Sequence, residues 1–316
     1  MQCEHKRFRS SSDIDLSVIV CTYNSRPETL EIVDKLLLPS LAQNADSSME
    51  LICVDDASPL RNETIECFRR HNERLSARFG RVVVDYRDTN VGFAKGYNDA
   101  ANRASGEVLI VANSDLYFPC GSVRGLADTL LRSEAYGIVG PVTNDCYSIQ
   151  KADLCSGIRD YDADTFEHIE TLARFIRGSD VGTLEAPCLS GFCFAIRSEI
   201  AGRFGLFDER FARAYFEDFD LCYRMKNEFK LIVDGSTYVH HGGVQGGSNS
   251  LWRQYSALWN TRRFFGNGLL FARRHGYVAW LKQMLHQNAA YHFKRYNLTQ
   301  LYEKEWLEQS SGDSAQ

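Results

Sequence analysis

Four short runs of apolar residues recur through the first half of the chain. Each run is rich in Val, Ile and Leu and barely alternates with polar residues, which is typical of strands buried on both faces of a parallel sheet. We therefore predict four parallel strands, at residues 16–20 (LSVIV), 51–54 (LICV), 81–86 (RVVVDY) and 107–112 (EVLIVA).

Apolar residues at helical spacing lie between these runs. Pro27 suits the first turn of a helix, and stripes at intervals of three and four residues continue through 93–101 and 123–131. Strands that alternate with helices predict an α/β fold with a mostly parallel, doubly wound sheet and right-handed crossovers. The first helix is expected to turn four side chains inward: Leu30, Val33, Leu37 and Leu41.

The second half of the chain has a less regular pattern. We predict a strand, a short helix and two further strands there, at residues 188–196, 217–229, 230–235 and 236–243. From about residue 251 onward, aromatic and basic side chains recur at helical spacing, and residues 311–316 resemble a frayed tail.

Composition excludes several classes of protein. The 316 residues carry a net charge of −5, whereas a general nucleic-acid binder is expected to be basic. No window approaches 18 apolar residues, and Met1–Ser12 lacks the apolar core of a secretion signal, so we expect neither a transmembrane helix nor export. None of the ten cysteines forms a CxxC pair, which favours a reduced, cytoplasmic protein in which the sequons at Asn62 and Asn297 are chance matches.

Polar residues end each of the four predicted strands. In open α/β sheets the ligand lies beyond the carboxyl ends of the strands, and the amides, hydroxyls and carboxylates here suit a nucleotide. The Gly-x-Gly-x-x-Gly and Gly-Lys-Ser/Thr loops are missing, which argues against a dinucleotide cofactor and a P-loop. The polar ends lie at residues 22–24, 55–58, 88–90 and 113–115.

Acidic residues occur at two places about a hundred residues apart. Asp115 follows the fourth predicted strand, and Glu217, Asp218 and Asp220 begin the predicted helix at 217–229. This arrangement suits an enzyme that handles a metal-bound diphosphate. One acid can hold a divalent cation, and another can take a proton from an attacking hydroxyl.

Eight segments in order resemble the family-2 glycosyltransferases of the GT-A fold. The resemblance spans residues 15–250 and implies transfer of a sugar from a nucleotide diphosphate with inversion at the anomeric carbon; a rhamnosyltransferase-like subgroup is one option. The segments are SVIVCTYN (17–24), VDDAS (54–58), NVGFAKGYN (90–98), NSD (113–115), LSGFCFAIR (189–197), FDERF (207–211), FEDFDL (216–221) and HHGG (240–243).

The resemblance implies a nucleotide pocket along the first half of the chain. Asp56 matches the position that binds the imide of a uracil or thymine base, although Asp55 and Asp56 are also suited to capping the next turn. Asn90 and Gly92 are expected at the same nucleotide, with helix capping as the alternative for Asn90. The other predicted nucleotide-binding residues are Cys21, Thr22, Tyr23, Asn24, Asn113 and Ser114.

The NSD segment stands where the family has Asp-x-Asp. Asp115 would bind the metal, and a neutral amide at Asn113 replaces the first acid. One carboxylate can suffice when the substrate supplies phosphate oxygens. His240 would be the other metal ligand, with His241 as the alternative, and the ion would be Mn²⁺ or Mg²⁺. Glycines from 242 to 247 would form a loop that closes over the donor.

The resemblance assigns the catalytic base to Asp218. Glu217 would orient the acceptor or cap the helix, and Asp220 is placed to pair with Arg224 at i, i+4. Gly191 would let the backbone approach the donor sugar, with a tight strand bend as the alternative.

We expect four regions: a polar segment (1–14), a catalytic domain (15–250, with a nucleotide half 15–118 and an acceptor half 119–250), a helical extension (251–310) and a tail (311–316). Apolar and basic residues in the extension suit either a peripheral contact at the inner face of the membrane or packing on the domain or a second subunit, which is slightly favoured.

The predicted function is a metal-dependent inverting glycosyltransferase that moves a sugar from a UDP- or dTDP-sugar to a hydroxyl of a glycan or lipid-linked glycan, by analogy in bacterial surface polysaccharide synthesis. A sugar-nucleotide nucleotidyltransferase is the alternative enzyme, and a catalytically inactive glycan-binding or interaction domain is the alternative outside enzymes. The first would carry a Gly-rich basic loop where this chain has CTYNSRPET.

Overall fold

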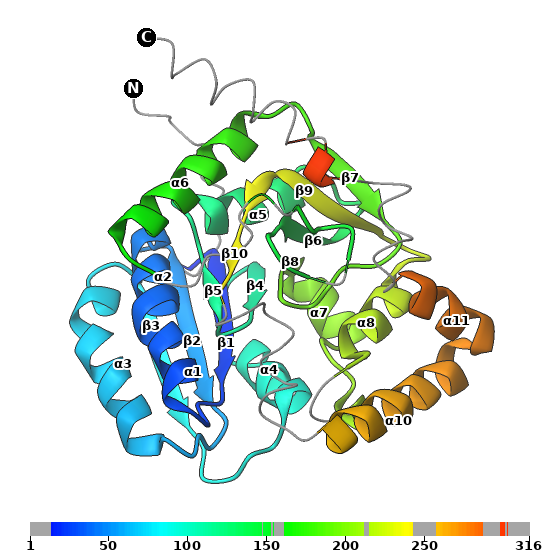
Figure 1. Cartoon of the computed structure of the whole chain (residues 1–316), viewed down its shortest axis with the longest axis horizontal. Helices are drawn as coiled ribbons and strands as arrows, with labels where there is room; N and C mark the ends of the chain where they lie inside the picture. The colour runs from blue at the N-terminus through cyan, green and yellow to red at the C-terminus, as the bar shows by residue number, and fades with distance from the viewer. Residues whose placement is uncertain are drawn as a thin grey trace.

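The computed structural model describes residues 14–146, 148–152, 154, 161–211, 215–242, 257–286, 298–300 and 302. Its centre is an eight-stranded sheet in the order β3-β2-β1-β4-β8-β6-β9-β7, with helices on both faces (Figure 1). The strands are β1 (Leu16–Thr22), β2 (Met49–Asp55), β3 (Arg81–Tyr86), β4 (Val108–Ala112), β6 (Tyr136–Val142), β7 (Thr183–Ala186), β8 (Cys193–Arg197) and β9 (Lys230–Tyr238).

The four predicted strands of the first half are confirmed as β1 to β4. They pair in parallel, and β1 lies between β2 and β4. Residues of β1, β2 and β4 are almost entirely buried, since helices cover both faces. This double burial explains why the apolar runs showed so little alternation.

The second half of the sheet departs from the predicted pattern. β8 pairs antiparallel with β4 and begins only at Cys193, since residues 187–192 are not part of a strand. The two strands predicted at 230–235 and 236–243 are one long strand, β9, followed by the two-residue strand β10 (His240–His241). β10 pairs antiparallel with β5 (Leu116–Tyr117), just beyond the carboxyl end of β4.

Helices pack two apolar layers against the sheet, one on each face. The helix predicted to begin at Pro27 contains a π-helical turn in its middle, and its inward residues Val33, Leu37 and Leu41 are buried while Leu30 is half-buried. The helices are α1 (Pro27–Ile32), η1 (Val33–Leu37), α2 (Leu38–Asn44), α3 (Arg61–Ser76), α4 (Phe93–Ala101), α5 (Ser122–Leu131), α6 (Ala163–Gly178), α7 (Ser198–Phe204), η2 (Glu209–Phe211) and α8 (Glu217–Met225).

Two further helices, α10 (Ala257–His275) and α11 (Tyr277–His286), lie beside α8 at the edge of the molecule (Figure 1). Phe271 is fully buried against α8, whereas Phe265 and Val278 are 60% and 68% exposed. The face of α10 that contains Phe271 therefore packs on the domain, which agrees with the favoured expectation of packing on the domain or a second subunit. None of the described helices is both long and apolar enough to cross a bilayer.

The predicted domain boundaries remain predictions, although one sheet runs through both proposed halves of the catalytic domain. The N-terminal segment to residue 13, Gly243 and the later loop glycines, most of residues 287–310 and the tail lie outside the described residues. The eight cysteines that the structure describes are all free.

Candidate functional site

The candidate site lies where β1 is flanked by β2 on one side and β4 on the other. In the parallel register Thr22 is opposite Asp55, and Val20 is opposite Ala112, so the segments after β2 and β4 leave the sheet on either side of the end of β1. This is the switch point of an open α/β sheet, where ligands bind. The predicted site residues Tyr23 and Ser114 are half-buried there.

Two of the predicted nucleotide residues, Thr22 and Asn24, instead hold the segments that follow β1 and β2 together. Thr22 donates a hydrogen bond from its hydroxyl to Asp55 (3.0 Å), which also accepts the Ser58 backbone N–H. The Asn24 side-chain amide donates to Thr64 (3.1 Å) at the start of α3. The side chains of Thr22 and Asn24 are therefore engaged inside the protein, and Asp55 is the acid that caps the turn.

Asp56 anchors a second loop. Its two carboxylate oxygens accept the backbone N–H groups of Val91 (2.8 Å) and Gly92 (2.9 Å), and Asn90 donates to its carbonyl (3.0 Å). Gly92 has φ of 90°, a conformation that favours glycine. The Asn90 Oδ1 atom is buried and has no hydrogen-bond partner among the described residues. Asp56 and Asn90 thus form a polar pair with acceptor capacity left over, since a carboxylate offers about four lone-pair sites.

Cys21, in β1, packs against α4. Its half-buried sulfur is so near α4 that a Cβ on Gly96 would come within 2.7 Å of Sγ. Burial, followed by the Asp56 charge, raises the pKa of the Cys21 thiol well above its ordinary value. The thiol is therefore neutral and packs between β1 and α4.

Asp115 faces His241 across the short β5–β10 pairing. The Asp115 Oδ1 and His241 Nε2 atoms are 3.3 Å apart, and His241 Nδ1 lies 2.8 Å from the Asp145 carbonyl, which requires an N–H at Nδ1. Asn144 fixes the backbone of His241 by accepting its N–H and donating to its carbonyl. Burial is the largest single influence and disfavours the imidazolium, but the Asp115 carboxylate and the Asp145 carbonyl and charge together raise the pKa of His241.

His240 points the other way. Its Nδ1 lies 3.0 Å from the Tyr238 hydroxyl and its Nε2 lies 3.5 Å from the Tyr161 hydroxyl. Burial, then the neighbouring imidazoles of His241 and His168, lowers the pKa of His240 to about 3, so the ring is neutral. The structure places His241, the alternative in the sequence analysis, beside Asp115, whereas the preferred His240 faces the opposite side because successive residues of a strand alternate. Which of the two binds a metal stays a prediction.

Residues 191–192 connect Asp115 to the acidic helix. The Asn113 backbone N–H donates to the Phe192 carbonyl (2.8 Å), and the Phe192 ring stacks on His241 at 5.2 Å. Next to it, the Gly191 backbone N–H donates to Asp218 Oδ2 (2.8 Å). A Cβ at Gly191 would lie 2.8 Å from the Asp218 Cβ, so this close approach needs glycine. Sequence reasoning missed Phe192 and Asn144, which carry no chemical signature of their own.

Glu217 and Asp218 begin α8 as a half-buried pair of carboxyl groups. Burial raises the pKa of Asp218 to about 6, against the backbone N–H groups of Gly191 and Phe219 that donate to its charged form. Burial and then the Asp218 charge raise the pKa of Glu217 to about 8. The Glu217 Oε2 atom is buried without a hydrogen-bond partner in the described part of the chain. At neutral pH the pair therefore holds about one proton, mainly on Glu217.

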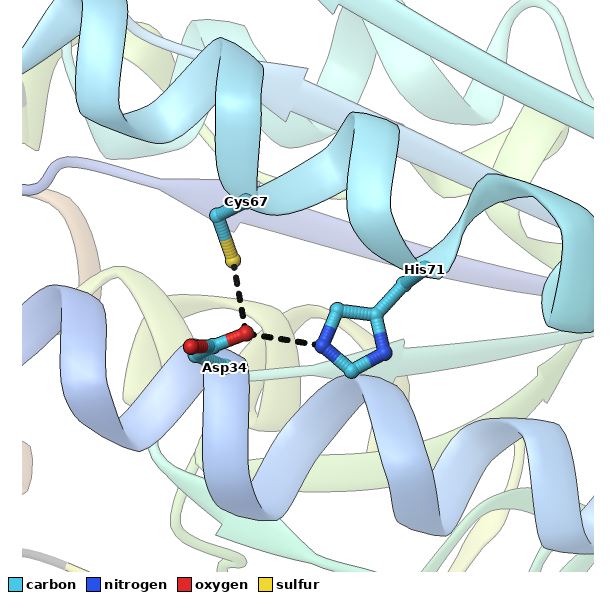
Figure 2. A group of neighbouring side chains, drawn as sticks. All are labelled: Asp34, Cys67 and His71. Atoms are coloured by element: carbon cyan, nitrogen blue, oxygen red, sulfur yellow. Dashed lines mark hydrogen bonds and ion pairs between the residues drawn. The ribbon is translucent and has the colours of Figure 1, made fainter.

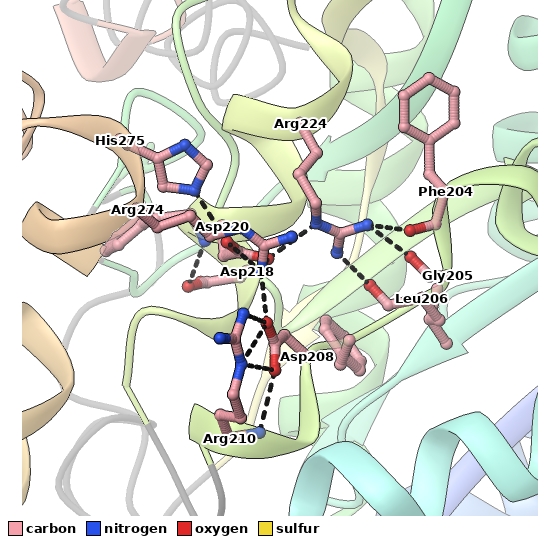
Figure 3. A network of polar contacts seen from close by, with 12 residues as sticks. Phe204, Gly205, Leu206, Asp208, Arg210, Asp218, Asp220, Arg224, Arg274 and His275 are labelled. Carbon is pink, nitrogen blue, oxygen red and sulfur yellow. Dashed lines mark hydrogen bonds and ion pairs between the residues drawn. The ribbon is translucent and has the colours of Figure 1, made fainter. Parts of the chain in front are cut away.

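Asp220 has a different environment from its two neighbours (Figure 3). It is fully buried and accepts from Arg224 Nε (2.7 Å) and lies 2.8 Å from His275 Nε2 and 3.2 Å from Arg274 Nη1. The predicted i, i+4 pair with Arg224 is confirmed. Arg274 also pairs with Asp208, which accepts a bidentate contact from Arg210. Asp220 is thus the centre of an ionic network that joins α8 to α10.

A separate group, Asp34, Cys67 and His71, joins η1 to α3 (Figure 2). Asp34 Oδ1 lies 2.8 Å from His71 Nε2 and accepts from the Cys67 thiol (3.5 Å), and Oδ2 accepts from Arg70 (2.8 Å). Burial, then the Asp34 charge, raises the pKa of Cys67 to about 12. A carboxylate already bonded to three donors, one of them a protonated thiol, accounts for the group as a link between helices.

Comparisons with known proteins agree with this architecture. Solved structures that match include S. aureus TarS 1–349 in complex with UDP-GlcNAc, at 18% identity and TM-score 0.52, over 74% of this chain and 60% of that one. GalNAc-T7 with UDP, GalNAc and Mn²⁺ matches at 16% identity and TM-score 0.51, over 75% of this chain and 45% of that one. At these identities the likeness shows a shared fold. No curated protein sequence matches the chain.

The family model described as glycosyl transferase family 2 matches residues 17–205, from β1 through α7. That match covers more than half of the 316 residues and includes the strand ends and loops that carry Asp56, Asp115 and Gly191. The chain belongs to glycosyl transferase family 2.

Proposed function

We propose that the protein is a metal-dependent inverting glycosyltransferase that uses a nucleotide diphosphate sugar. One observation carries this proposal. Asp218 accepts the Gly191 N–H, and the next residue, Phe192, stacks on the His241 ring that faces Asp115, although Asp115 and Asp218 lie about a hundred residues apart in the sequence. An acid for a cation and an acid for a proton thus flank one site.

The Asp115–His241 pair fits a divalent cation. Because His241 Nδ1 donates to the Asp145 carbonyl, a neutral ring has its lone pair on Nε2, toward Asp115 Oδ1. Metal-binding histidines typically hold their second nitrogen in this way. Asp115 itself approaches Nε2, at 3.3 Å. We assign Asp115 and His241 as the ligands of Mn²⁺ or Mg²⁺, which when bound would neutralise charge on the leaving diphosphate.

Asp218 is the proposed base. Its pKa of about 6 leaves it ionised at neutral pH yet close enough to that pH to accept a proton effectively. The acceptor hydroxyl gives its proton to Asp218 as its oxygen bonds to the anomeric carbon, and the bond from that carbon to the diphosphate oxygen breaks with the electron pair leaving on the diphosphate. This single displacement inverts the anomeric carbon. Glu217, protonated at neutral pH, can donate a hydrogen bond to the acceptor or the sugar.

Asp56 and Asn90 are proposed to bind the base. Both present acceptor oxygens at the side of β1 opposite Asp115, where the imide N–H of uracil or thymine would find a partner. We therefore propose a UDP- or dTDP-sugar donor, with rhamnosyl, galactosyl and N-acetylhexosaminyl groups as candidates. UDP and UDP-GlcNAc are bound in the TarS structures of the same fold, which supports the uridine option.

The outer face of α10 and α11 is proposed to bind an anionic bilayer, near a lipid-linked glycan acceptor of surface polysaccharide synthesis. It exposes large apolar side chains, and residues 257–286 contain no Asp or Glu. Two copies of such a face would repel each other in a symmetric dimer, whereas anionic headgroups complement it. The exposed apolar residues are Phe265, Leu269, Tyr277, Val278 and Leu281, and the basic residues of the two helices are Arg262, Arg263, Arg273, Arg274 and Lys282.

Donor turnover tests the proposed reaction. With Mn²⁺ present, the protein should slowly hydrolyse one of the candidate nucleotide sugars and release UDP or dTDP, and EDTA should stop the release. A nucleotidyltransferase would instead make a sugar nucleotide from a nucleoside triphosphate and a sugar phosphate, and an inactive domain would do neither. Either of these results would contradict the proposal.

A further inference from the structure

We infer that Asn267 of α10 is a positioning residue for Asp218, an inference that rests on the proposed role of Asp218 as the base. Asn267 is 5% exposed, although it comes from a helix outside the sheet. Its side-chain amide donates to the carbonyls of Phe211 (2.7 Å) and Tyr215 (3.0 Å). These carbonyls mark the end of η2 and the approach to α8. One amide thus fixes the chain just before the carboxylate pair.

The backbone at this point adopts a conformation that needs support. Tyr215 and Phe216 both have φ of 73°, and the residue that follows is Glu217. Two successive left-handed residues with bulky side chains form a strained stretch of backbone. Such a conformation persists only when its surroundings hold it, and here the Asn267 hydrogen bond to the Tyr215 carbonyl is part of that hold.

α10 also shapes the space that receives Phe216. This ring is 1% exposed and packs against Phe264 at 5.3 Å and Phe271 at 5.5 Å, both from α10. A Cβ on Gly268 would come within 3.3 Å of the Phe216 ring and 2.8 Å of the Trp280 indole nitrogen. The glycine next to Asn267 therefore allows α10 to close on the residue that precedes Glu217.

The geometry has a direct chemical consequence. Asp218 accepts the Gly191 N–H only while α8 begins at its present place. The Gly191 backbone and the Asp218 side chain are already so close that a Cβ added at Gly191 would lie 2.8 Å from the Asp218 Cβ. A displacement of about 1 Å at a catalytic group can cost ~10²-fold in rate. Loss of the Asn267 bonds should therefore lower the rate of the chemical step and leave the nucleotide side of the site, on β1, β2 and β4, unchanged.

Asn267→Leu tests this inference, because leucine keeps the size of the side chain and removes both donors. Activity is measured as Mn²⁺-dependent hydrolysis of the candidate nucleotide sugar that wild type turns over fastest, at a temperature where all variants are folded by circular dichroism. We expect kcat to fall about 10- to 100-fold while Mn²⁺-dependent affinity for UDP or dTDP stays within about twofold. Gly266→Ala, at the exposed position next to Asn267 where an added Cβ would meet no neighbour, is the matched control and should match wild type.

A suppressor separates positioning from general damage. Asparagine tolerates the left-handed region better than tyrosine. Tyr215→Asn in the Asn267→Leu background should therefore give a kcat at least threefold higher than that of Asn267→Leu alone. If Asn267→Leu does not fold, Asn267→Ser retains one donor and should show a smaller loss with the same suppression. An unchanged kcat, an equal loss of nucleotide affinity, or no restoration by Tyr215→Asn would overturn the inference. Absence of metal-dependent nucleotide binding in wild type would instead contradict the proposed function itself.

Discussion

The Asp115 carboxylate and the His241 imidazole face one another with 3.3 Å between Oδ1 and Nε2, while Nδ1 of the same ring is committed to the Asp145 carbonyl. His240, one residue earlier, directs both ring nitrogens toward tyrosine hydroxyls. Only one of two adjacent histidines is therefore available to share a cation with Asp115.

This difference predicts unequal effects of two matched substitutions. His241→Gln should weaken Mn²⁺-dependent nucleotide binding by about tenfold or more, because it removes a ligand nitrogen. His240→Gln should leave that affinity nearly unchanged in the folded protein, although it disturbs a buried site. Isothermal titration of both variants with UDP or dTDP checks the prediction. A larger loss of affinity in His240→Gln would return the ligand role to His240.

Asp218→Asn should be a variant impaired in the chemical step. Loss of a general base typically costs ~10²–10⁴ in rate, and nucleotide affinity should change little because Asp218 lies on α8. In wild type the base must be ionised, so kcat/KM should rise with pH through an apparent pKa of about 6 and fall below it. Rates of donor hydrolysis measured from pH 5 to 8 give this profile. Near-normal activity of the variant would move the base to Glu217.

Asp220→Asn should impair folding stability. The substitution removes a fully buried charge and leaves Arg224, Arg274 and His275 without their shared partner, which typically costs about 3 kcal/mol or more. Glu228→Gln breaks an exposed pair with Arg203 and should cost less than about 1 kcal/mol. Urea unfolding of both variants gives the comparison. Equal stabilities would show that the Asp220 network does not secure α10 to α8.

The outer face of α10 and α11 should bind anionic vesicles in a salt-sensitive way. Added salt screens arginine and lysine against the headgroups. Flotation with phosphatidylglycerol liposomes at low and high salt, together with light scattering, measures binding and mass. Arg273→Glu with Lys282→Glu should release the protein from vesicles without changing its mass. Absence of flotation at either salt, with a dimer in solution that Phe265→Asp dissociates, would identify the face as a subunit interface instead.

The strands β1 to β4 could be predicted because a strand buried on both faces needs apolar residues at nearly every position, which gives a continuous apolar run in the sequence. The ion pair of Asp220 and Arg224 could also be predicted, because the two residues are four apart in one helix. His241 could not be chosen over His240, because a shift of one residue along a strand reverses the face, and only pairing with β5 sets that register. Asn267, 52 residues from Tyr215, acts through a packing contact that leaves no periodic signal.

The most direct test of the metal-dependent account is calorimetric titration of UDP and dTDP into wild type and Asp115→Ala, with Mn²⁺ and with EDTA. Wild type should bind one of the nucleotides with Mn²⁺ and lose at least about tenfold in affinity with EDTA, and Asp115→Ala should show the weaker affinity under both conditions. Equal Mn²⁺-dependent binding by wild type and Asp115→Ala would contradict the assignment of Asp115 as the ligand that couples the metal to the nucleotide.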